Sequence, residues 1–133
     1  MRIEILLCDD IVFYSRMRTF LASKEIYKET GQIFWNDFGK KWFVCIKNKG
    51  KTIGVCAYVK TKKNIIFCSD YVLPEYRNRG IYDKLFEVRM KECPDLPIKA
   101  VATKQSLGTF LRHGFVSRKV KGKFTVVERG KNG

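Results

Sequence analysis

The chain has 133 residues, 45% of them hydrophobic and 30% charged, which fits one globular domain over residues 1–133 and excludes a disordered chain. Lysine and arginine total 27 against 13 acidic residues, and the formal net charge of +14 favours an acidic partner. No apolar run approaches the roughly 18 residues that a membrane-spanning helix needs, so we expect no membrane partner.

The N-terminal part of the chain predicts one strand and two short helices. Residues 2–7 favour a strand, and Asp9 or Asp10 is a candidate N-cap for the helix that follows. The apolar stripe of this helix consists of Phe13, Met17, Phe20 and Leu21. Residues 23–30 predict a second short helix, whereas 32–40 predict no regular structure.

The middle of the chain predicts a meander of three strands. Residues 42–47, 52–60 and 64–72 are rich in β-branched and aromatic side chains. The turns 48–50 and 61–63 separate these runs and contain glycine, asparagine or lysine. We therefore expect three consecutive antiparallel strands.

The last part of the chain mixes helices with strands. Apolar residues at helical spacing predict a helix over 81–93, which Pro94 terminates. A strand over 97–103, a helix over 106–113 and a closing strand over 124–128 complete the pattern. This order adds βαβ connections to the meander.

The segment from Val72 to Leu85 predicts an anion site. An apolar strand ends at Pro74, a basic turn that contains Gly80 follows, and Ile81 opens a helix. The turn presents unpaired backbone N–H groups, and the positive end of the helix dipole lies behind them. A phosphate group is the expected ligand.

Two motifs resemble those of a known family. The run Arg77-Asn78-Arg79-Gly80-Ile81-Tyr82 resembles the Arg/Gln-x-x-Gly-x-Gly/Ala motif of the GNAT superfamily of acetyl-CoA-dependent N-acyltransferases. The later segment from Ala102 to Phe115 is similar to the family's Asn-x-x-Ala-x-x-x-Tyr-x-x-x-Gly-Phe pattern. The resemblance implies an α+β fold in three layers: a mixed, mostly antiparallel central sheet with helices on both faces.

The resemblance also implies a binding site for acetyl-CoA or another acyl-CoA. Backbone N–H groups from Arg77 to Tyr82 would hold the pyrophosphate, and Arg77 and Arg79 would add positive charge. Val72 and Leu73 would pair with the pantetheine arm. A free amide near Val72 would polarise the thioester carbonyl. The implied cofactor-binding residues are Tyr71, Val72, Leu73, Arg77, Asn78, Arg79, Gly80, Ile81, Tyr82, Thr103 and Phe110.

Three positions depart from the family pattern. Tyr82 stands where the family has Gly or Ala, Thr103 where it has Asn, and Phe110 where it has a tyrosine that protonates the departing thiolate. Phenylalanine donates no proton, which leaves the role to Tyr82, Tyr71, Tyr58 or water. Because a thiol with a pKa of roughly 8.5 leaves readily as thiolate, slow catalysis would survive this loss.

The attacking amine must lose a proton, and Asp70 is the predicted base. Tyr82 is the second catalytic candidate, and its hydroxyl would face phosphate or the acceptor; the alternative is that its ring covers the sheet. In a regular strand, Ile66, Cys68, Asp70 and Val72 share one face, and Asp70 precedes the expected thioester contact. The alternative for Asp70 is a strand-end carboxylate paired with an arginine. Trp35 and Trp42 are expected in the core.

The cysteines and the histidine indicate whether the chain binds a metal and in which compartment it is found. The five cysteines form no C-x-x-C pair and there is a single histidine, so we expect no metal site. No secretory signal is visible at the N-terminus, and cysteines in apolar runs favour reduced thiols in a cytoplasmic protein.

The surplus positive charge leaves two functional classes open. The turns 47–51 and 118–123 should frame the mouth of the coenzyme site, where they would attract an acidic or nucleic-acid-associated acceptor. The leading hypothesis is an N-acyltransferase, monomeric or homodimeric, that acts on an unidentified amine. The alternative is a basic binding module on the same scaffold with weak or no catalysis.

Overall fold

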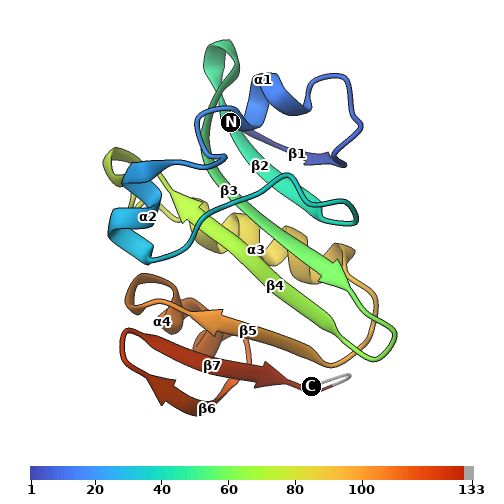
Figure 1. The fold of residues 1–133 in the computed structure, drawn as a ribbon, viewed down its shortest axis with the longest axis vertical. Helices are drawn as coiled ribbons and strands as arrows, with labels where there is room; N and C mark the ends of the chain where they lie inside the picture. Colours follow the sequence, from blue (N-terminus) through green and yellow to red (C-terminus); the bar gives the residue numbers. More distant parts are fainter. Residues whose placement is uncertain (131–133) are drawn as a thin grey trace.

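The computed structural model describes residues 1–130, and its centre is a seven-stranded sheet in the order β1-β2-β3-β4-β5-β7-β6 (Figure 1). The strands are β1 (Arg2–Leu6), β2 (Lys41–Lys47), β3 (Lys51–Lys60), β4 (Ile65–Val72), β5 (Ile98–Ala102), β6 (Val116–Lys121) and β7 (Phe124–Arg129). Among the strand pairs of residues 1–130, only β4 and β5 are parallel. The predicted mixed, mostly antiparallel sheet is confirmed.

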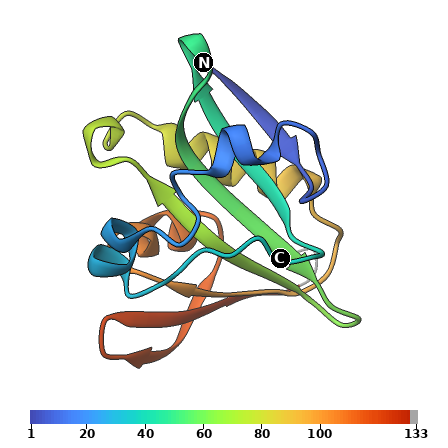
Figure 2. The ribbon, with the colours of Figure 1, turned by 45° about the horizontal axis from the view of Figure 1, so that its top comes forward.

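Helices cover both faces of the sheet, as predicted (Figures 1 and 2). The helices α1 (Phe13–Met17) and α2 (Lys24–Thr30) lie on one face, and α3 (Ile81–Glu92) and α4 (Lys104–Arg112) lie on the other. Each face has its own core. The α3 and α4 side buries Phe43, Phe86 and Phe110 among others, and the α1 and α2 side buries Phe13, Phe20 and Trp42.

Local capping explains both ends of α2. The Ser23 side chain accepts a hydrogen bond from the Ile26 N–H at 3.2 Å at the start of α2. At its end, Gly31 has the left-handed backbone, with φ of 72°. The predicted cap of α1 is wrong, because Val12 precedes this helix and the Asp10 carboxylate instead accepts from the Leu7 N–H at 2.6 Å. Asp10 therefore stabilises the turn after β1.

A β-bulge in β4 changes which side chains share a face. Ala57 of β3 pairs with Cys68 and Val55 pairs with Tyr71, so β4 contains one extra residue there, and Ser69 has a φ of 60°. The bulge reverses the alternation, because Cys68 packs with the α1 and α2 core whereas Val72 packs with the α3 core. The predicted common face of Ile66, Cys68, Asp70 and Val72 is therefore wrong.

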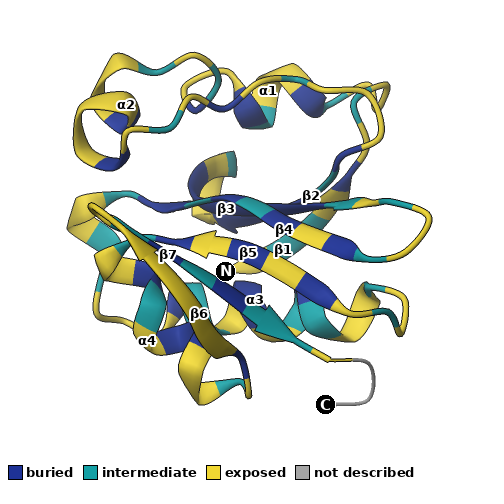
Figure 3. Ribbon diagram, turned by 60° about the horizontal axis from the view of Figure 1, so that its bottom comes forward, coloured by how far each residue is buried: buried dark blue, intermediate teal, exposed yellow. Residues whose placement is uncertain are grey.

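The pairing between β4 and β5 is short, and the sheet splits beyond it. The register consists of Ile65 with Ile98, Ile66 with Lys99 and Phe67 with Ala100. From Cys68 to Val72, β4 has no pairing to β5. The part of the sheet formed by β5, β7 and β6 is covered on one face only. Figure 3 shows exposed residues along its other face. The split places a free strand edge beside the N-terminus of α3.

Candidate functional site

A cleft of about 420 Å³ lies at the split between β4 and β5. Residues from five segments line it: the end of α2, the end of β4, the turn before α3, the start of α3, and α4. Most of the predicted cofactor residues line this cleft, namely Tyr71, Val72, Arg77, Asn78, Gly80, Ile81, Tyr82 and Thr103. The topology thus gathers residues that sequence reasoning had assigned to one site.

The N-terminus of α3 faces this cleft without a side-chain cap. Gly80 precedes the helix with a φ of 78°, and Asn78 has a φ of 61°. A Cβ added to Gly80 would meet no atom within 4 Å. The first N–H groups of the helix therefore have no side-chain acceptor and lie beside open space, which is the arrangement that an anion needs.

Filling this space tests the site. We expect Gly80→Trp to weaken acetyl-CoA binding by about 100-fold or more, because the indole would occupy the space in front of the helix N-terminus. Gly122→Trp is the matched control, since Gly122 also has a positive φ, 59°, and open space around its Cβ but does not line the cleft. Both variants should lose about 1–2 kcal/mol of stability from backbone strain. Calorimetric titration measures the binding, and equal loss in both variants would contradict the assignment.

Arg77 does not direct its charge toward the turn. Its Nε donates to the Val72 carbonyl at 2.9 Å, its Nη1 donates to the Glu29 carboxylate, and its guanidinium lies over the Tyr71 ring at 5.1 Å. The predicted contribution of Arg77 to phosphate binding is therefore not supported by its contacts. Arg79, the other cation of that turn, is exposed beside Gly80.

Glu29 is a site residue that the sequence analysis missed. Besides Arg77, it accepts hydrogen bonds from the Tyr71 hydroxyl at 2.7 Å and from Gln105 Nε2 at 3.1 Å. The hydrogen bond from Arg77 lowers the pKa of Glu29, and burial together with Glu29 raises the pKa of Tyr71 to about 12. Nothing local in the sequence marks Glu29, because its partners come from β4, the following turn and α4.

Asp70 lies in a network with Arg89 and Tyr82. Arg89 Nη1 and Nη2 donate to the two carboxylate oxygens of Asp70 at 2.6 and 2.9 Å, and the Tyr82 hydroxyl also donates to Asp70. The Arg89 side chain is fully buried, and its guanidinium lies 3.9 Å from the Phe67 ring centroid. Burial and the Asp70 carboxylate raise the pKa of Tyr82 well above its usual value. These contacts agree with the alternative interpretation of Asp70, a carboxylate paired with an arginine.

Three predicted residues have structural contacts that limit their part in binding. The Leu73 N–H donates to Ile53 O at 2.9 Å, so it is not free for a pantetheine arm. Thr103 caps α4 in a reciprocal pair with Ser106. Phe110 is 2% exposed, its ring packs against Phe86 and Phe115, and it lines a second hollow rather than this cleft.

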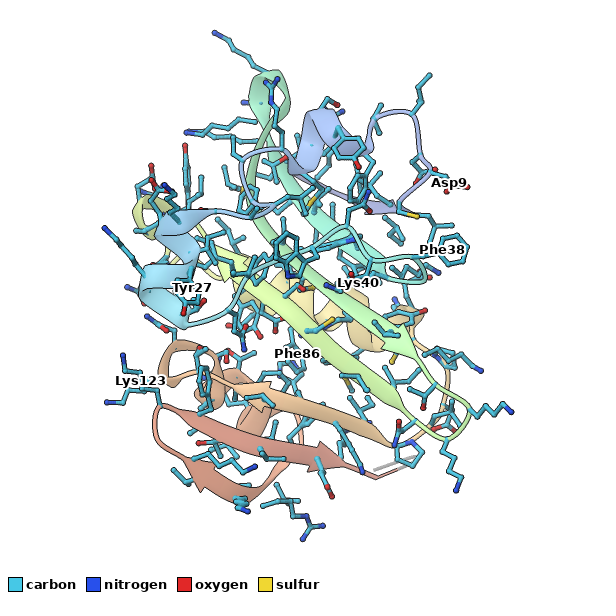
Figure 4. All side chains as sticks on the ribbon, viewed as in Figure 1. Asp9, Tyr27, Phe38, Lys40, Phe86 and Lys123 are labelled. Carbon is cyan, nitrogen blue, oxygen red and sulfur yellow. The ribbon has the colours of Figure 1, made fainter. Side chains whose placement is uncertain are left out.

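A second hollow, of about 500 Å³, opens on the other side of the split. Its lining includes Trp35, Lys40, Ser69 and Val101. Lys40, labelled in Figure 4, donates to Ser69 Oγ at 3.1 Å and pairs with Asp37 at 3.2 Å. Trp35 is 54% exposed here, so its predicted place in the core is wrong, whereas Trp42 is buried as predicted.

The two hollows share three lining residues, Asp70, Thr103 and Ser106. The two hollows therefore adjoin at these residues, one on each side of the split. A molecule lying along the free edge of β4 from one side would meet a second molecule that enters from the opposite side. Tyr58, one of the predicted proton donors, lines neither hollow.

Residues 1–130 contain no group of three or more histidine, cysteine, aspartate or glutamate residues placed to hold a metal ion. All five cysteines are free thiols, and burial raises the pKa of Cys56. Within the same range, no helix is long and apolar enough to cross a membrane.

Comparison with known proteins identifies the fold. No family model and no curated protein matches the sequence. Among solved structures, an acyl-CoA N-acyltransferase from Pseudomonas aeruginosa superposes with a TM-score of 0.78 at 11% identity, over 97% of this chain and 99% of that chain. Tetrahymena GCN5 gives 0.70 at 18% identity, over 98% and 96%. An acetyltransferase of the GNAT family from Staphylococcus aureus gives 0.66 at 14% identity, over 97% and 99%.

The chain has the GNAT fold. The fold predicted from the two motifs is thereby confirmed, and the likeness extends over nearly the whole chain. At these identities the likeness concerns the fold, so activity and substrates rest on the residues themselves. The GNAT fold of this chain carries Tyr82 beside Asp70 and a phenylalanine, Phe110, within its core.

Proposed function

We propose that this protein is an N-acyltransferase that moves an acetyl or related acyl group from acyl-CoA to a primary amine by direct attack on the thioester. The observation that carries the proposal is the meeting of the two hollows at Asp70, Thr103 and Ser106. One hollow has the uncapped helix N-terminus that suits a pyrophosphate, and the other is open to an acceptor. When bound, acyl-CoA supplies an activated thioester.

The residues present fit such a coenzyme. The space beside Gly80 accommodates phosphate oxygens near the first N–H groups of α3. The free edge of β4 from Cys68 to Val72 offers backbone groups to an extended chain. An N–H group near Val72 polarises the carbonyl that the amine attacks. The Val72 carbonyl accepts from Arg77 Nε, and only an N–H group can donate to the thioester oxygen.

Asp70 and Tyr82 move the proton in this proposal. The acceptor's ammonium gives one proton to the Tyr82 oxygen while the Tyr82 proton passes to Asp70, which leaves a neutral amine. The nitrogen–carbon bond then forms as the carbon–sulfur bond breaks, and the nitrogen releases its second proton to water. Tyr82 therefore never becomes a phenolate, which agrees with its raised pKa. Phe110 gives the thiolate no proton, so water protonates it and turnover is slow.

The acceptor in this proposal is acidic or is attached to an acidic molecule such as a nucleic acid. The uncovered sheet face beside the second hollow carries Lys99, Lys119 and Lys121, which have no carboxylate partner within residues 1–130. The strand registers place the β2–β3 and β6–β7 turns at the same end of the sheet as Val72. Positive charge on this side would concentrate an anionic partner and make its association sensitive to salt.

A second candidate function is a basic binding module on the same scaffold. Two observations favour it: the Asp70 carboxylate is already bound by Arg89 and Tyr82, and Phe110 lies in the core. Such a protein would bind nucleic acid with an affinity that falls steeply with salt and would transfer no acyl group. The cytoplasmic location and the monomeric or homodimeric state stay predictions.

Calorimetry and mass spectrometry separate the two functions. We expect acetyl-CoA to bind with micromolar affinity, of order 8 kcal/mol, because the site has both a phosphate cradle and a free strand edge. Incubation with acetyl-CoA and a panel of polyamines, basic and acidic peptides, aminoglycosides, tRNA and DNA should then give an acyl adduct on one class. Absence of heat and of a thermal shift at millimolar acetyl-CoA would overturn the proposed function.

A further inference from the structure

Three cationic side chains gather around Tyr76 at the outer end of the cleft. Lys47 Nζ lies 5.0 Å from the centre of the Tyr76 ring, Lys51 Nζ lies 5.4 Å from it, and Arg79 Cζ lies 5.4 Å from it. Lys47 also donates to the Tyr76 hydroxyl at 3.3 Å, and this hydrogen bond with the nearby ammonium groups lowers the pKa of Tyr76. We call these four residues the Tyr76 cluster.

The charges of the Tyr76 cluster are not balanced by the protein. None of its cations forms an ion pair with a carboxylate of residues 1–130, and all three are exposed. Glu75 is the neighbouring acidic residue, and its charge acts on Tyr76 without pairing with a cation of the cluster. Three like charges that converge on one ring repel each other, so the arrangement costs stability unless an anion joins it.

The Tyr76 cluster adjoins the coenzyme cleft. A hollow of about 220 Å³ lies between the β2–β3 turn and the start of α3, and Lys47, Tyr76 and Arg79 line it. Tyr76 and Ile81 line both this hollow and the larger cleft. An anion at the cluster would therefore be a neighbour of the group held by the N-terminus of α3.

We propose that the Tyr76 cluster binds the 3′-phosphate of coenzyme A and so selects coenzyme A over carriers that lack this group. The inference rests on the proposed function, since the pyrophosphate of the same molecule would occupy the Gly80 turn. A phosphate monoester carries close to two negative charges and three acceptor oxygens, which match a site of several cations without a carboxylate. Lys47 and Lys51 flank the β2–β3 turn, so substituting these two residues leaves the turn before α3 unchanged.

Comparing coenzyme A with 3′-dephospho-coenzyme A tests the inference by calorimetry. We expect the native protein to bind coenzyme A at least about 10-fold more tightly, as one charge-assisted contact predicts. In the double variant Lys47→Met and Lys51→Met, coenzyme A should bind about as weakly as the dephospho form does, while affinity for the dephospho form changes less than about 3-fold. Lys51→Met alone should give part of the effect.

The matched control removes the same charge from the opposite end of the sheet. The double variant Lys62→Met and Lys63→Met alters the turn between β3 and β4, and it should keep the preference for coenzyme A. Equal affinity of the native protein for the two ligands would overturn this inference and leave the proposed function standing. Equal binding combined with loss of oligonucleotide binding in the Lys47 and Lys51 variant would assign the cluster to nucleic acid instead. Binding of neither coenzyme would overturn the proposed function and this inference together.

Discussion

Replacing Arg89 with methionine should lower the free energy of unfolding by about 3–5 kcal/mol, because Asp70 would keep a carboxylate that is 14% exposed and has lost its cation. The Arg89 side chain is fully buried between Phe67 and Phe86, and it also donates to the Ala57 carbonyl at 3.0 Å. Methionine fills similar space without these donors. Urea denaturation monitored by tryptophan fluorescence measures the change.

Two further variants separate the ion pair from packing. Arg112→Met breaks an ion pair with Asp83 whose side chains are 60% and 43% exposed, and it should cost less than about 1 kcal/mol. Combining Arg89→Met with Asp70→Asn removes the stranded charge and should recover part of the loss. A loss for Arg89→Met no larger than that for Arg112→Met would contradict a stabilising role of the buried pair.

Replacing Tyr82 with phenylalanine should lower kcat by about 100-fold, because it removes the oxygen through which the proposed proton transfer runs. The ring remains, and Asp70 keeps both bonds from Arg89, so KM for acetyl-CoA should stay within about 3-fold. Steady-state kinetics with the acceptor found by mass spectrometry measures both quantities.

The pH profile distinguishes proton transfer from a structural role. As the pH approaches about 10.4, a lysine-type amine loses its proton to solvent, so the native protein and Tyr82→Phe should converge in rate. A ratio that stays constant with pH would show that Tyr82 acts on structure alone. Tyr14→Phe is the control, since this exposed hydroxyl contacts Asn36 at 2.7 Å and should leave the rate unchanged.

Much of the fold follows from signals that act over a few residues. The β-branched and aromatic runs place β2, β3 and β4 within two residues of their observed bounds, and glycine in the turn before Ile81 marks the start of α3. Such signals are readable because burial and backbone preference act on neighbouring positions. The two motifs that predict the fold are local in the same sense, since each lies within one short segment of the chain.

What the sequence analysis missed depends on contacts between distant segments. The bulge at Ser69 has no residue type that requires it, yet it decides that Asp70 faces Arg89. Arg89 itself had a readable signal, because it follows Leu85 by four residues and Phe86 by three, on the apolar face of a helix. Glu29 had none. Trp35 resembles a core residue in composition, and only the open second hollow explains its exposure.

The short β4–β5 register has a consequence for the molecule as a whole. Three residue pairs join the sub-sheet β1–β4 to the sub-sheet β5–β7, and the rest of the junction depends on helix packing. A ligand in the split contacts both sub-sheets and adds a connection where main-chain hydrogen bonding stops. Binding of a ligand in the split would thus couple the unfolding of the C-terminal sub-sheet to that of the N-terminal one. The bound protein should unfold in a more cooperative transition and at a higher melting temperature.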